Sequence, residues 1–454
     1  MKKNILNYIF AILVLSVVSC GTTQHKDGSQ EPDINYGGLR PAGQENVLQL
    51  AVDPIPTVRI AIIGTGNRGS KASRRFTFMN GVEIKAICDI KEGALKKTQE
   101  IITGRNFPPA DEYLGEEAWR KVVERDDIDL VYITTDWANH VPMAVYAMEQ
   151  GKHVAIEVPA ALSVDECWQL VDQAEKMRLH CTILENCTYD FFELNTLNMA
   201  QQGVFGELVH VEGAYIHDLR SQLKSTTNWR TPFYEDYIGN PYPTHGLGPV
   251  CQALNIHRGD KMNYLVSVSS DQFGMTQYLE DTFGKDSERA RKEYRMGDMN
   301  TTLIKTEKGK TIMIQHDVTS PRPYSRLHTL SGTKGFAQKY PTFGIALEPN
   351  AHNFLNKEEY DKLIKKYEHP FITEVGEFAK KVGGHGGMDF IMDYRLIYCL
   401  QHGLPLDMDV YDAAEWSCLV ELTEISASNG GKPVRIPDFT RGDWDQLDGL
   451  KFAK

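Results

Sequence analysis

Residues 58–89 carry the pattern that most constrains the fold of this chain. The apolar run Val58-Arg59-Ile60-Ala61-Ile62-Ile63 has the length and β-branched character of a buried parallel strand. It leads directly into Gly64-Thr65-Gly66-Asn67-Arg68-Gly69, after which a helix is expected over residues 67–79. In such a turn the glycines permit a sharp bend, a close approach of backbone to pyrophosphate, and tight helix–strand packing. We therefore predict a dinucleotide site that includes Gly64, Gly66, Asn67 and Arg68.

One carboxylate indicates which dinucleotide binds. A second strand, over residues 82–88, is followed by Asp89, which stands 20 residues after Gly69. An acidic group at that place accepts hydrogen bonds from the ribose hydroxyls and repels a 2′-phosphate. The sequence thus predicts NAD rather than NADP, and a chance glycine turn is the alternative interpretation.

Strands and helices continue to alternate after this unit. Strands are expected over residues 130–134, 153–156 and 180–185, with helices over 140–150 and 163–177. This alternation is typical of a doubly wound parallel sheet, in which ligands gather at the carboxyl ends of the strands. Those ends supply the remaining candidate cofactor residues, which are Trp137, Ala138, Asn139, His140, Glu157, Val158 and Asn186. Packing and helix capping are the alternative roles for Trp137 and His140.

The pattern changes to consecutive strands after residue 206. Strands over 301–305 and 311–316 flank a Lys308-Gly309 turn, and helices are expected over 390–401 and 410–428. We predict an α/β chain whose N-terminal doubly wound Rossmann domain covers residues 51–190. An α+β domain with an open, mostly antiparallel sheet follows over residues 191–454, and its C-terminal helices pack back on the first domain.

The N-terminus indicates export. Lys2-Lys3, an apolar run over residues 9–18, and a small residue before Cys20 are typical of a bacterial lipoprotein signal over residues 1–20. A transmembrane anchor is the alternative, but the run is short for a bilayer. We expect lipidation of Cys20, a polar tether over residues 21–50, and a place in the cell envelope, on the periplasmic side or the cell surface. An exported NAD protein has no dinucleotide pool, so it should keep its cofactor and return it to the starting oxidation state in every turnover.

Composition excludes several classes of partner. The net charge of −12 argues against nucleic acid, and there is no basic patch for anionic lipid. Besides Cys20 there are seven cysteines without metal-binding spacing, which we interpret as buried free thiols, with a disulfide as the alternative. His217-Asp218 and His257 lack a third partner at recognisable spacing, so no metal is predicted. A homo-oligomer is compatible with the sequence, which leaves the oligomeric state open.

The loop Glu157-Val158-Pro159 introduces a resemblance. A Rossmann domain with a Glu-x-Pro loop and a strand-rich second domain resembles the glucose–fructose oxidoreductase-like dehydrogenases. Those enzymes usually have Glu-Lys-Pro, whose lysine assists proton transfer from the substrate hydroxyl. Because Val158 cannot transfer a proton, ordinary dehydrogenase activity is disfavoured.

Other segments resemble one offshoot of that superfamily, the NAD-dependent glycosidases of glycoside hydrolase family 109. The resemblance covers residues 55–445 and implies removal of terminal α-N-acetylgalactosamine or a related sugar. It is carried by Trp137-Ala138-Asn139-His140, Glu185-Asn186-Cys187-Thr188-Tyr189, Asn228-Trp229-Arg230, Tyr242-Pro243-Thr244-His245-Gly246, Ser320-Pro321-Arg322-Pro323-Tyr324 and Gly383-Gly384-His385-Gly386-Gly387-Met388-Asp389.

The resemblance also implies a sugar site. It would be formed by Tyr215, Arg230, Tyr242, Pro243, Thr244, His245 and Tyr324. Thr244 and Gly246 suit a tight turn that presents His245. The glycines around His385 suit a loop that closes over the ligand and carries an acid or base, although a merely flexible loop is the alternative.

The implied reaction is a redox-neutral elimination and addition. NAD⁺ would take hydride from sugar carbon 3, a base would remove the proton of carbon 2, and the glycosidic oxygen would leave carbon 1. His385 is the candidate acid, and His245 and Tyr215 are candidates for base and polariser. An exported sugar oxidoreductase with tightly bound NAD(P), and a sugar-binding lipoprotein without catalysis, are the alternatives.

Overall fold

Six parallel strands form the first sheet of the computed structural model, which describes residues 34–222 and 228–453. The expected signal and Cys20 lie outside the described residues. The strands run in the order β3-β2-β1-β4-β5-β6, as a doubly wound sheet requires. They are β1 (Val58–Ile63), β2 (Val82–Asp89), β3 (Asp111–Leu114), β4 (Leu130–Ile133), β5 (His153–Ile156) and β6 (Cys181–Ile183).

Helices cover both faces of this sheet, so its central strands are apolar throughout. Every residue of β4 and β5 is buried, which explains why these strands appear in the sequence as continuous apolar runs. The helices are α1 (Asn67–Phe76), α2 (Glu92–Thr103), α3 (Ala118–Val123), α4 (His140–Glu149) and α5 (Val164–Met177). The predicted Rossmann domain is confirmed.

An eight-stranded sheet follows, in the order β13-β12-β11-β7-β10-β9-β8-β14. Only the β7–β10 pair is parallel, so the prediction of a mostly antiparallel sheet is also confirmed. The strands are β7 (Leu208–Ile216), β8 (Met262–Ser269), β9 (Asn300–Thr306), β10 (Thr311–Asp317), β11 (Ser325–Gly332), β12 (Gly335–Gln338), β13 (Gly344–Leu347) and β14 (Val434–Arg435).

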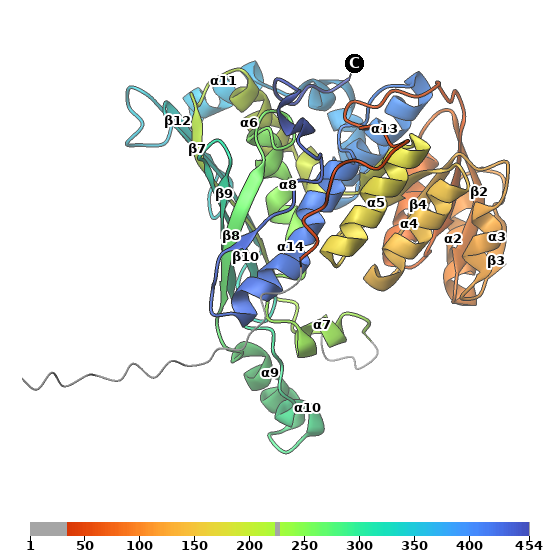
Figure 1. Ribbon diagram of the computed structural model, residues 1–454, viewed down its shortest axis with the longest axis horizontal. Coiled ribbons are helices and arrows are strands. Elements are labelled where there is room, and N and C mark those ends of the chain that lie inside the picture. Colours follow the sequence, from red (N-terminus) through yellow and green to blue (C-terminus); the bar gives the residue numbers. More distant parts are fainter. Residues whose placement is uncertain (1–33, 223–227, 454) are drawn as a thin grey trace, which may run out of the picture. The chain divides into compact units, whose positions relative to one another are not determined.

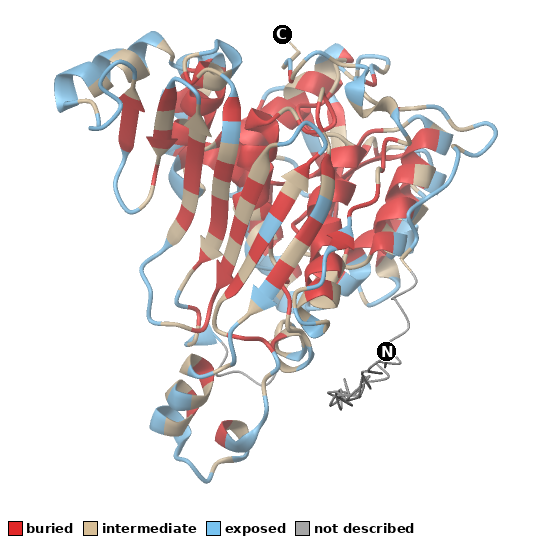
Figure 2. Cartoon of the chain, turned by 60° about the vertical axis from the view of Figure 1, so that its left-hand side comes forward, coloured by how far each residue is buried: buried red, intermediate tan, exposed pale blue. Residues whose placement is uncertain are grey.

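Two helices from the second half of the chain pack between the two sheets. α8 contacts β7, and α14 contacts β8, β6 and α5, so both lie between the large sheet and the Rossmann helices (Figure 1). Along β8 and β9 buried positions alternate with intermediate or exposed ones, so one face of the large sheet is packed and the other is more exposed (Figure 2). The helices are α6 (Phe191–Gln201), α7 (Thr231–Asp236), α8 (Thr244–Ala253), α9 (Gly274–Phe283), α10 (Glu288–Arg291), α11 (Lys357–Lys366), α12 (Glu377–Val382), α13 (Met388–His402) and α14 (Val410–Ser428).

Residues 34–50 pack against the protein, which corrects the expected polar tether over residues 21–50. The indole of Trp168 donates to the carbonyl of Asn35 at 2.8 Å, and the Val47 amide donates to a buried tyrosine hydroxyl. Val47 and Leu50 are buried in the core. These sparse apolar residues anchor the segment against the core.

The cysteines match their interpretation as thiols. All seven after Cys20 are free and buried. In the described parts of the chain, no helix has both the length and the apolar character needed to cross a bilayer.

Candidate active site

The glycine turn after β1 has the shape that a dinucleotide requires. Gly64 has φ +88°, and a Cβ there would lie 2.7 Å from the Thr134 backbone. A Cβ on Gly69 would lie 2.0 Å from the Gly64 carbonyl oxygen, so this glycine is needed for close packing of α1 on β1. A Cβ on Gly66 would meet nothing within 4 Å, and Gly66 and Asn67 are exposed. The turn therefore leaves open space where a pyrophosphate would lie against the N-terminus of α1.

Asp89 lies at the end of β2, next to this turn. Its Oδ2 accepts hydrogen bonds from the Thr65 amide at 2.7 Å and the Thr65 hydroxyl at 3.1 Å, while Oδ1 accepts from the Lys91 amide. These bonds orient a carboxylate that remains partly exposed. The residues present thus fit NAD: glycines for the pyrophosphate and an oriented acceptor for ribose hydroxyls.

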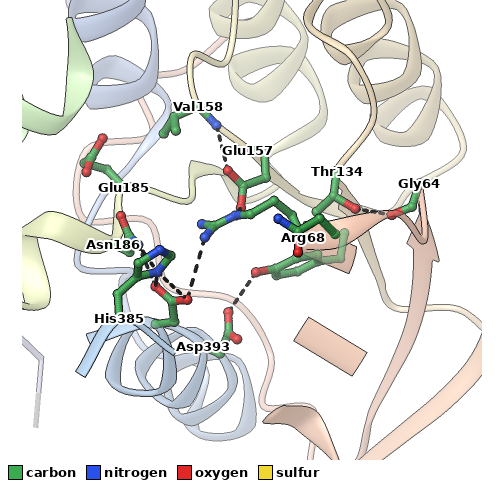
Figure 3. Close-up of polar contacts among 12 residues, drawn as sticks. Gly64, Arg68, Thr134, Glu157, Val158, Glu185, Asn186, His385 and Asp393 are labelled. Carbon is green, nitrogen blue, oxygen red and sulfur yellow. Dashed lines mark hydrogen bonds and ion pairs between the residues drawn. The ribbon is translucent and has the colours of Figure 1, made fainter. Parts of the chain in front are cut away.

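Arg68 connects the turn to the loop after β5. Its Nε donates to Glu157 Oε1 at 2.6 Å, and Figure 3 shows the arginine extended from α1 toward this carboxylate. Val158 is 2% exposed, and its carbonyl accepts a hydrogen bond from the Trp137 indole at 3.0 Å. The structure therefore brings Arg68, Glu157, Val158 and Trp137 together at the strand ends.

His140 contacts the loops after β4 and β5, and its expected role at the cofactor stays a prediction. The ring is fully buried, with Nδ1 2.8 Å from the Pro159 carbonyl and Nε2 3.3 Å from the Thr135 carbonyl. Burial lowers the pKa of His140, so it is a neutral residue at the start of α4. Ala138 and Asn139 are exposed in the preceding 3-10 turn, where the Asn139 amide is bound to Asp136.

His245 lies in the first turn of a helix, not in the tight turn that its neighbours suggested. Gly246 packs directly on Gly213 of β7: a Cβ on Gly213 would lie 2.1 Å from the Gly246 carbonyl oxygen. The glycine next to His245 is therefore needed for the close approach of α8 to the sheet. Thr244 and Pro243 are buried beside it. This packing brings His245 next to Tyr215, with ring centroids 5.5 Å apart.

Glu185 orients His245. It follows β6, is fully buried, and its Oε1 lies 2.7 Å from His245 Nδ1. Burial opposes the charged carboxylate, but His245 and the Cys187 amide outweigh that effect and lower the pKa of Glu185. Because an ionised carboxylate only accepts hydrogen bonds, Nδ1 carries the proton and Nε2 keeps a lone pair that can accept one. Nε2 lies 3.4 Å from the Tyr242 hydroxyl.

Aromatic side chains surround this histidine. The Tyr215 ring lies 4.8 Å from that of Tyr242 and 5.7 Å from that of His217. His217 in turn lies 4.8 Å from Tyr324, which is partly exposed. Tyr215, Tyr242, His245 and Tyr324 are therefore grouped as expected, and His217 joins them. Pairs of aromatic rings with hydroxyl and imidazole groups suit a sugar, which has apolar faces and polar edges.

Arg230 approaches the same group from the N-terminus of α7. Its guanidinium carbon lies 5.3 Å from the Trp137 ring centroid, 5.0 Å from Trp229 and 5.4 Å from Tyr242. The Arg230 Nε is buried and has no hydrogen-bond partner among the described residues. A buried donor without a partner costs free energy, so this side chain is suited to bind a polar ligand group.

His385 lies against the carboxylate of Asp389. Its Nδ1 lies 2.9 Å from Asp389 Oδ2, and Asn186 donates to Oδ1 of the same carboxylate at 2.5 Å. The His385 side chain is 53% exposed, whereas Asp389 is fully buried. Figure 3 shows Asn186 beside His385. Asn186, expected at the cofactor, is itself buried and binds Asp389.

Each carboxylate in the site already has a basic partner. Glu157 pairs with Arg68, Glu185 with His245, and Asp389 with His385. Glu185, Cys187 and His245 also bring potential metal ligands within 4.8 Å of one another. However, His245 Nδ1 is bound to Glu185, and burial raises the pKa of the Cys187 thiol, so this cluster serves to hold His245.

The sequence did not assign roles to Glu185, Asp389 or His217. Glu185 and Asp389 stood in motifs that were recognised, but their histidine partners could not be identified without the fold. His217 was considered only as a metal ligand. His217 stands two residues after Tyr215, and residues two apart on a strand share a face, so this spacing could have placed His217 in the site.

Comparisons with known proteins agree with both halves of this site. Residues 58–184 match the NAD-binding Rossmann fold of the oxidoreductase family, and residues 189–446 match the C-terminal domain of glycosyl hydrolase 109. An alpha-N-acetylgalactosaminidase of Bacteroides fragilis is 59% identical over 413 residues, which are 89% of this chain and 97% of that protein. A glycosyl hydrolase family 109 protein of Porphyromonas gingivalis is 52% identical over 430 residues, 91% of each chain.

Solved structures share the fold at low identity. An oxidoreductase domain protein from Kribbella flavida has a TM-score of 0.66 and 16% identity, with 84% of this chain and all of that chain covered. A levoglucosan dehydrogenase in complex with NADH and levoglucosan has a TM-score of 0.63, the same identity and the same coverage. Together with the matches above, the oriented histidines beside a dinucleotide turn show that the chain belongs to glycosyl hydrolase family 109 and is a glycosidase with NAD as its cofactor.

Proposed function

We propose that this enzyme removes terminal α-N-acetylgalactosamine, or a closely related sugar, from glycans and glycoconjugates without net oxidation. One observation carries the proposal: His245, oriented by Glu185, lies among Tyr215 and Tyr242 directly beyond the strand ends of the NAD-binding sheet. The Bacteroides fragilis relative named for that activity supports the choice of sugar.

NAD would be held by the turn of Gly64 and Gly66 and by Asp89. When bound, it supplies a hydride acceptor and later a hydride donor for one sugar carbon, so the sugar regains its oxidation state. The protein's part is to hold the sugar between the aromatic rings and to move protons. Val158, in place of a lysine, removes the usual proton acceptor of the related dehydrogenases, so this work passes to the histidines.

The two histidines have different tasks in this proposal. His245 Nε2, with Nδ1–H fixed on Glu185, accepts a proton from the sugar, and Tyr215 and Tyr242 polarise the neighbouring oxygens. His385 donates a proton to the glycosidic oxygen as it departs. Among the described residues, no pair of unpartnered carboxylates lines the site, which distinguishes this arrangement from that of ordinary glycosidases.

The experiment uses a chromogenic α-N-acetylgalactosaminide and purified protein without added cofactor. Release of the chromophore supports the proposal. Accumulation of reduced nicotinamide with a free sugar would instead indicate a sugar oxidoreductase, and no change in either signal would indicate a binding protein.

We also propose that the enzyme is anchored to the cell envelope through a lipid on Cys20. The basic, apolar and small-residue pattern of residues 1–20 supports this. Cells fed a labelled fatty acid should incorporate the label into the wild-type protein. A Cys20→Ala variant should not be labelled and should leave the membrane fraction; equal labelling of both proteins would refute the anchor.

A further inference from the structure

We propose that Asp389 is a positioning residue for His385: it holds the imidazole with Nδ1 protonated, so that Nε2 is presented to the departing oxygen. The inference rests on the proposed role of His385 as the acid. Asp389 itself does not touch the sugar in this account, because its side chain is completely buried beneath the histidine.

The Asp389 carboxylate is surrounded by donors. His385 Nδ1 lies 3.0 Å from Oδ1 and 2.9 Å from Oδ2, and Asn186 donates to Oδ1 at 2.5 Å. Arg75 and Arg68, both from α1, lie 3.5 and 3.6 Å from Oδ2. Of these partners His385 is the most exposed, with 53% of its side chain accessible against 27% for Arg68 and 4% for Arg75. The buried carboxylate is therefore connected to solvent mainly through His385.

The glycines fold the loop tightly onto this carboxylate. Gly384 has φ +90°, and a Cβ there would lie 2.8 Å from the Cβ of Asp389. Gly387 has φ +113°, and its Cβ would lie 2.9 Å from the Ala379 backbone. His385 itself has φ +43°, a conformation that costs energy for a residue with a side chain. The segment is therefore a specific, strained turn around Asp389, in contrast to the freely closing loop expected from its glycines.

Electrostatics fixes the tautomer of the histidine. Burial opposes the charged form of Asp389, but the hydrogen bond from His385 and the charges of Arg75 and Arg68 outweigh it and lower its pKa. The ionised carboxylate can only accept, so Nδ1 of His385 must donate. As an acid His385 is therefore the imidazolium, and the proton that it gives up is the one on Nε2, on the side away from Asp389, while the Nδ1 proton stays hydrogen-bonded to the carboxylate.

The test compares Asp389→Asn with Asp393→Asn. Asp393 lies one turn further along α13 and is equally buried; it binds Arg75 at 2.6 Å and the Tyr132 hydroxyl at 2.8 Å but not His385. We expect Asp389→Asn to lower kcat on glycosides with poor leaving groups by at least about 10-fold, and to spare nitrophenyl glycosides. Asp393→Asn should lower stability and leave the ratio of the two kcat values unchanged.

A double variant tests whether Asp389 affects kcat through His385. In a His385→Ala background, Asp389→Asn should reduce kcat by less than about 3-fold further, since the group that it positions is gone. Should Asp389→Asn fail to fold, Gly384→Ala replaces it, because its methyl displaces the turn while the carboxylate and both arginines remain. If the kcat loss of the double variant equals the product of the two single losses, the positioning role of Asp389 is overturned, whereas the acid role of His385 still stands. A His385→Ala enzyme with no leaving-group dependence would overturn the acid role on which it rests.

Discussion

His245 and Glu185 are 60 residues apart in the chain, yet Nδ1 of the histidine lies 2.7 Å from Oε1 of the carboxylate. The contact forms because Gly246 lets α8 approach β7 closely while Glu185 emerges from β6 beneath it. The next residue, Asn186, supports the second histidine through Asp389. Two consecutive residues at one strand end therefore organise both proposed proton-transfer groups.

Glu185→Gln should reduce kcat by about 10²–10⁴-fold, the range of general acid–base catalysis. The amide can donate to Nδ1, which would move the imidazole proton to Nε2 and block its function as a base. Glu175→Gln is the matched control: Glu175 is equally buried and binds the Tyr411 hydroxyl far from the site. Steady-state kinetics should show the loss in kcat for Glu185→Gln only. Similar kcat values for both variants would contradict the role of Glu185.

Asp89→Ala should weaken retention of the cofactor. The variant removes the acceptor for the ribose hydroxyls and also the hydrogen bonds that hold Thr65 in the glycine turn. A hydrogen bond to a charged group contributes about 1.5–3 kcal/mol, so we expect dinucleotide affinity to fall by roughly 10–150-fold. The measurement is the amount of NAD released on denaturation after desalting. Wild-type protein that releases none would refute a permanently held cofactor.

His385→Ala should harm natural glycosides more than activated ones. A nitrophenolate departs with little protonation, whereas a sugar alkoxide needs an acid, so activity on natural glycosides should fall by about 10²–10⁴-fold. NAD content should stay the same, since the side chain is largely exposed and its ion-pair partner is Asp389 rather than a residue proposed to hold the dinucleotide. Equal losses on both substrate types would transfer the acid role to another group, with His245 and Tyr242 as the next candidates.

Glu193 makes stability depend on pH below the neutral range. Burial opposes its charge, but Lys339 and Arg326 outweigh that effect and lower its pKa from 4.5 to about 2. Its contribution is complete above about pH 4.5 and is lost as the pH falls toward 2. The difference in unfolding free energy between wild type and Glu193→Gln should therefore shrink by about 1.4 kcal/mol for each pH unit below 4.5. Urea unfolding measures it, and a constant difference would contradict the ion pairs.

The sequence predicted elements whose stability is local or whose burial is complete. The strands Val58–Ile63 and His153–Ile156 and the helix Val410–Ser428 have the expected ends, because continuous apolar runs and an Asp409 cap mark them. α8 was missed because two glycines and a proline oppose a helix locally. Its close contact with β7 outweighs that preference, and a contact between distant segments is not visible in the sequence.

The candidate site likewise contains residues that the sequence located and residues that only the fold reveals. The glycine turn and Asp89 could be located because their spacing within one βαβ unit determines their geometry. The burial of His140 could not be predicted, because only packing decides that this ring turns inward to the Pro159 carbonyl. Glu185 and Asp389 acquire roles only when folding brings them to histidines far along the chain or across a strained turn.

Exchange at carbon 2 of the sugar tests the central claim most directly. A redox–elimination route removes the proton of carbon 2 and later restores one from solvent, whereas direct displacement at carbon 1 never touches it. Hydrolysis of an α-N-acetylgalactosaminide in heavy water, followed by mass spectrometry and NMR of the released sugar, measures this. The account predicts product deuterated at carbon 2. Product that retains only protium there would contradict it, however fast the hydrolysis.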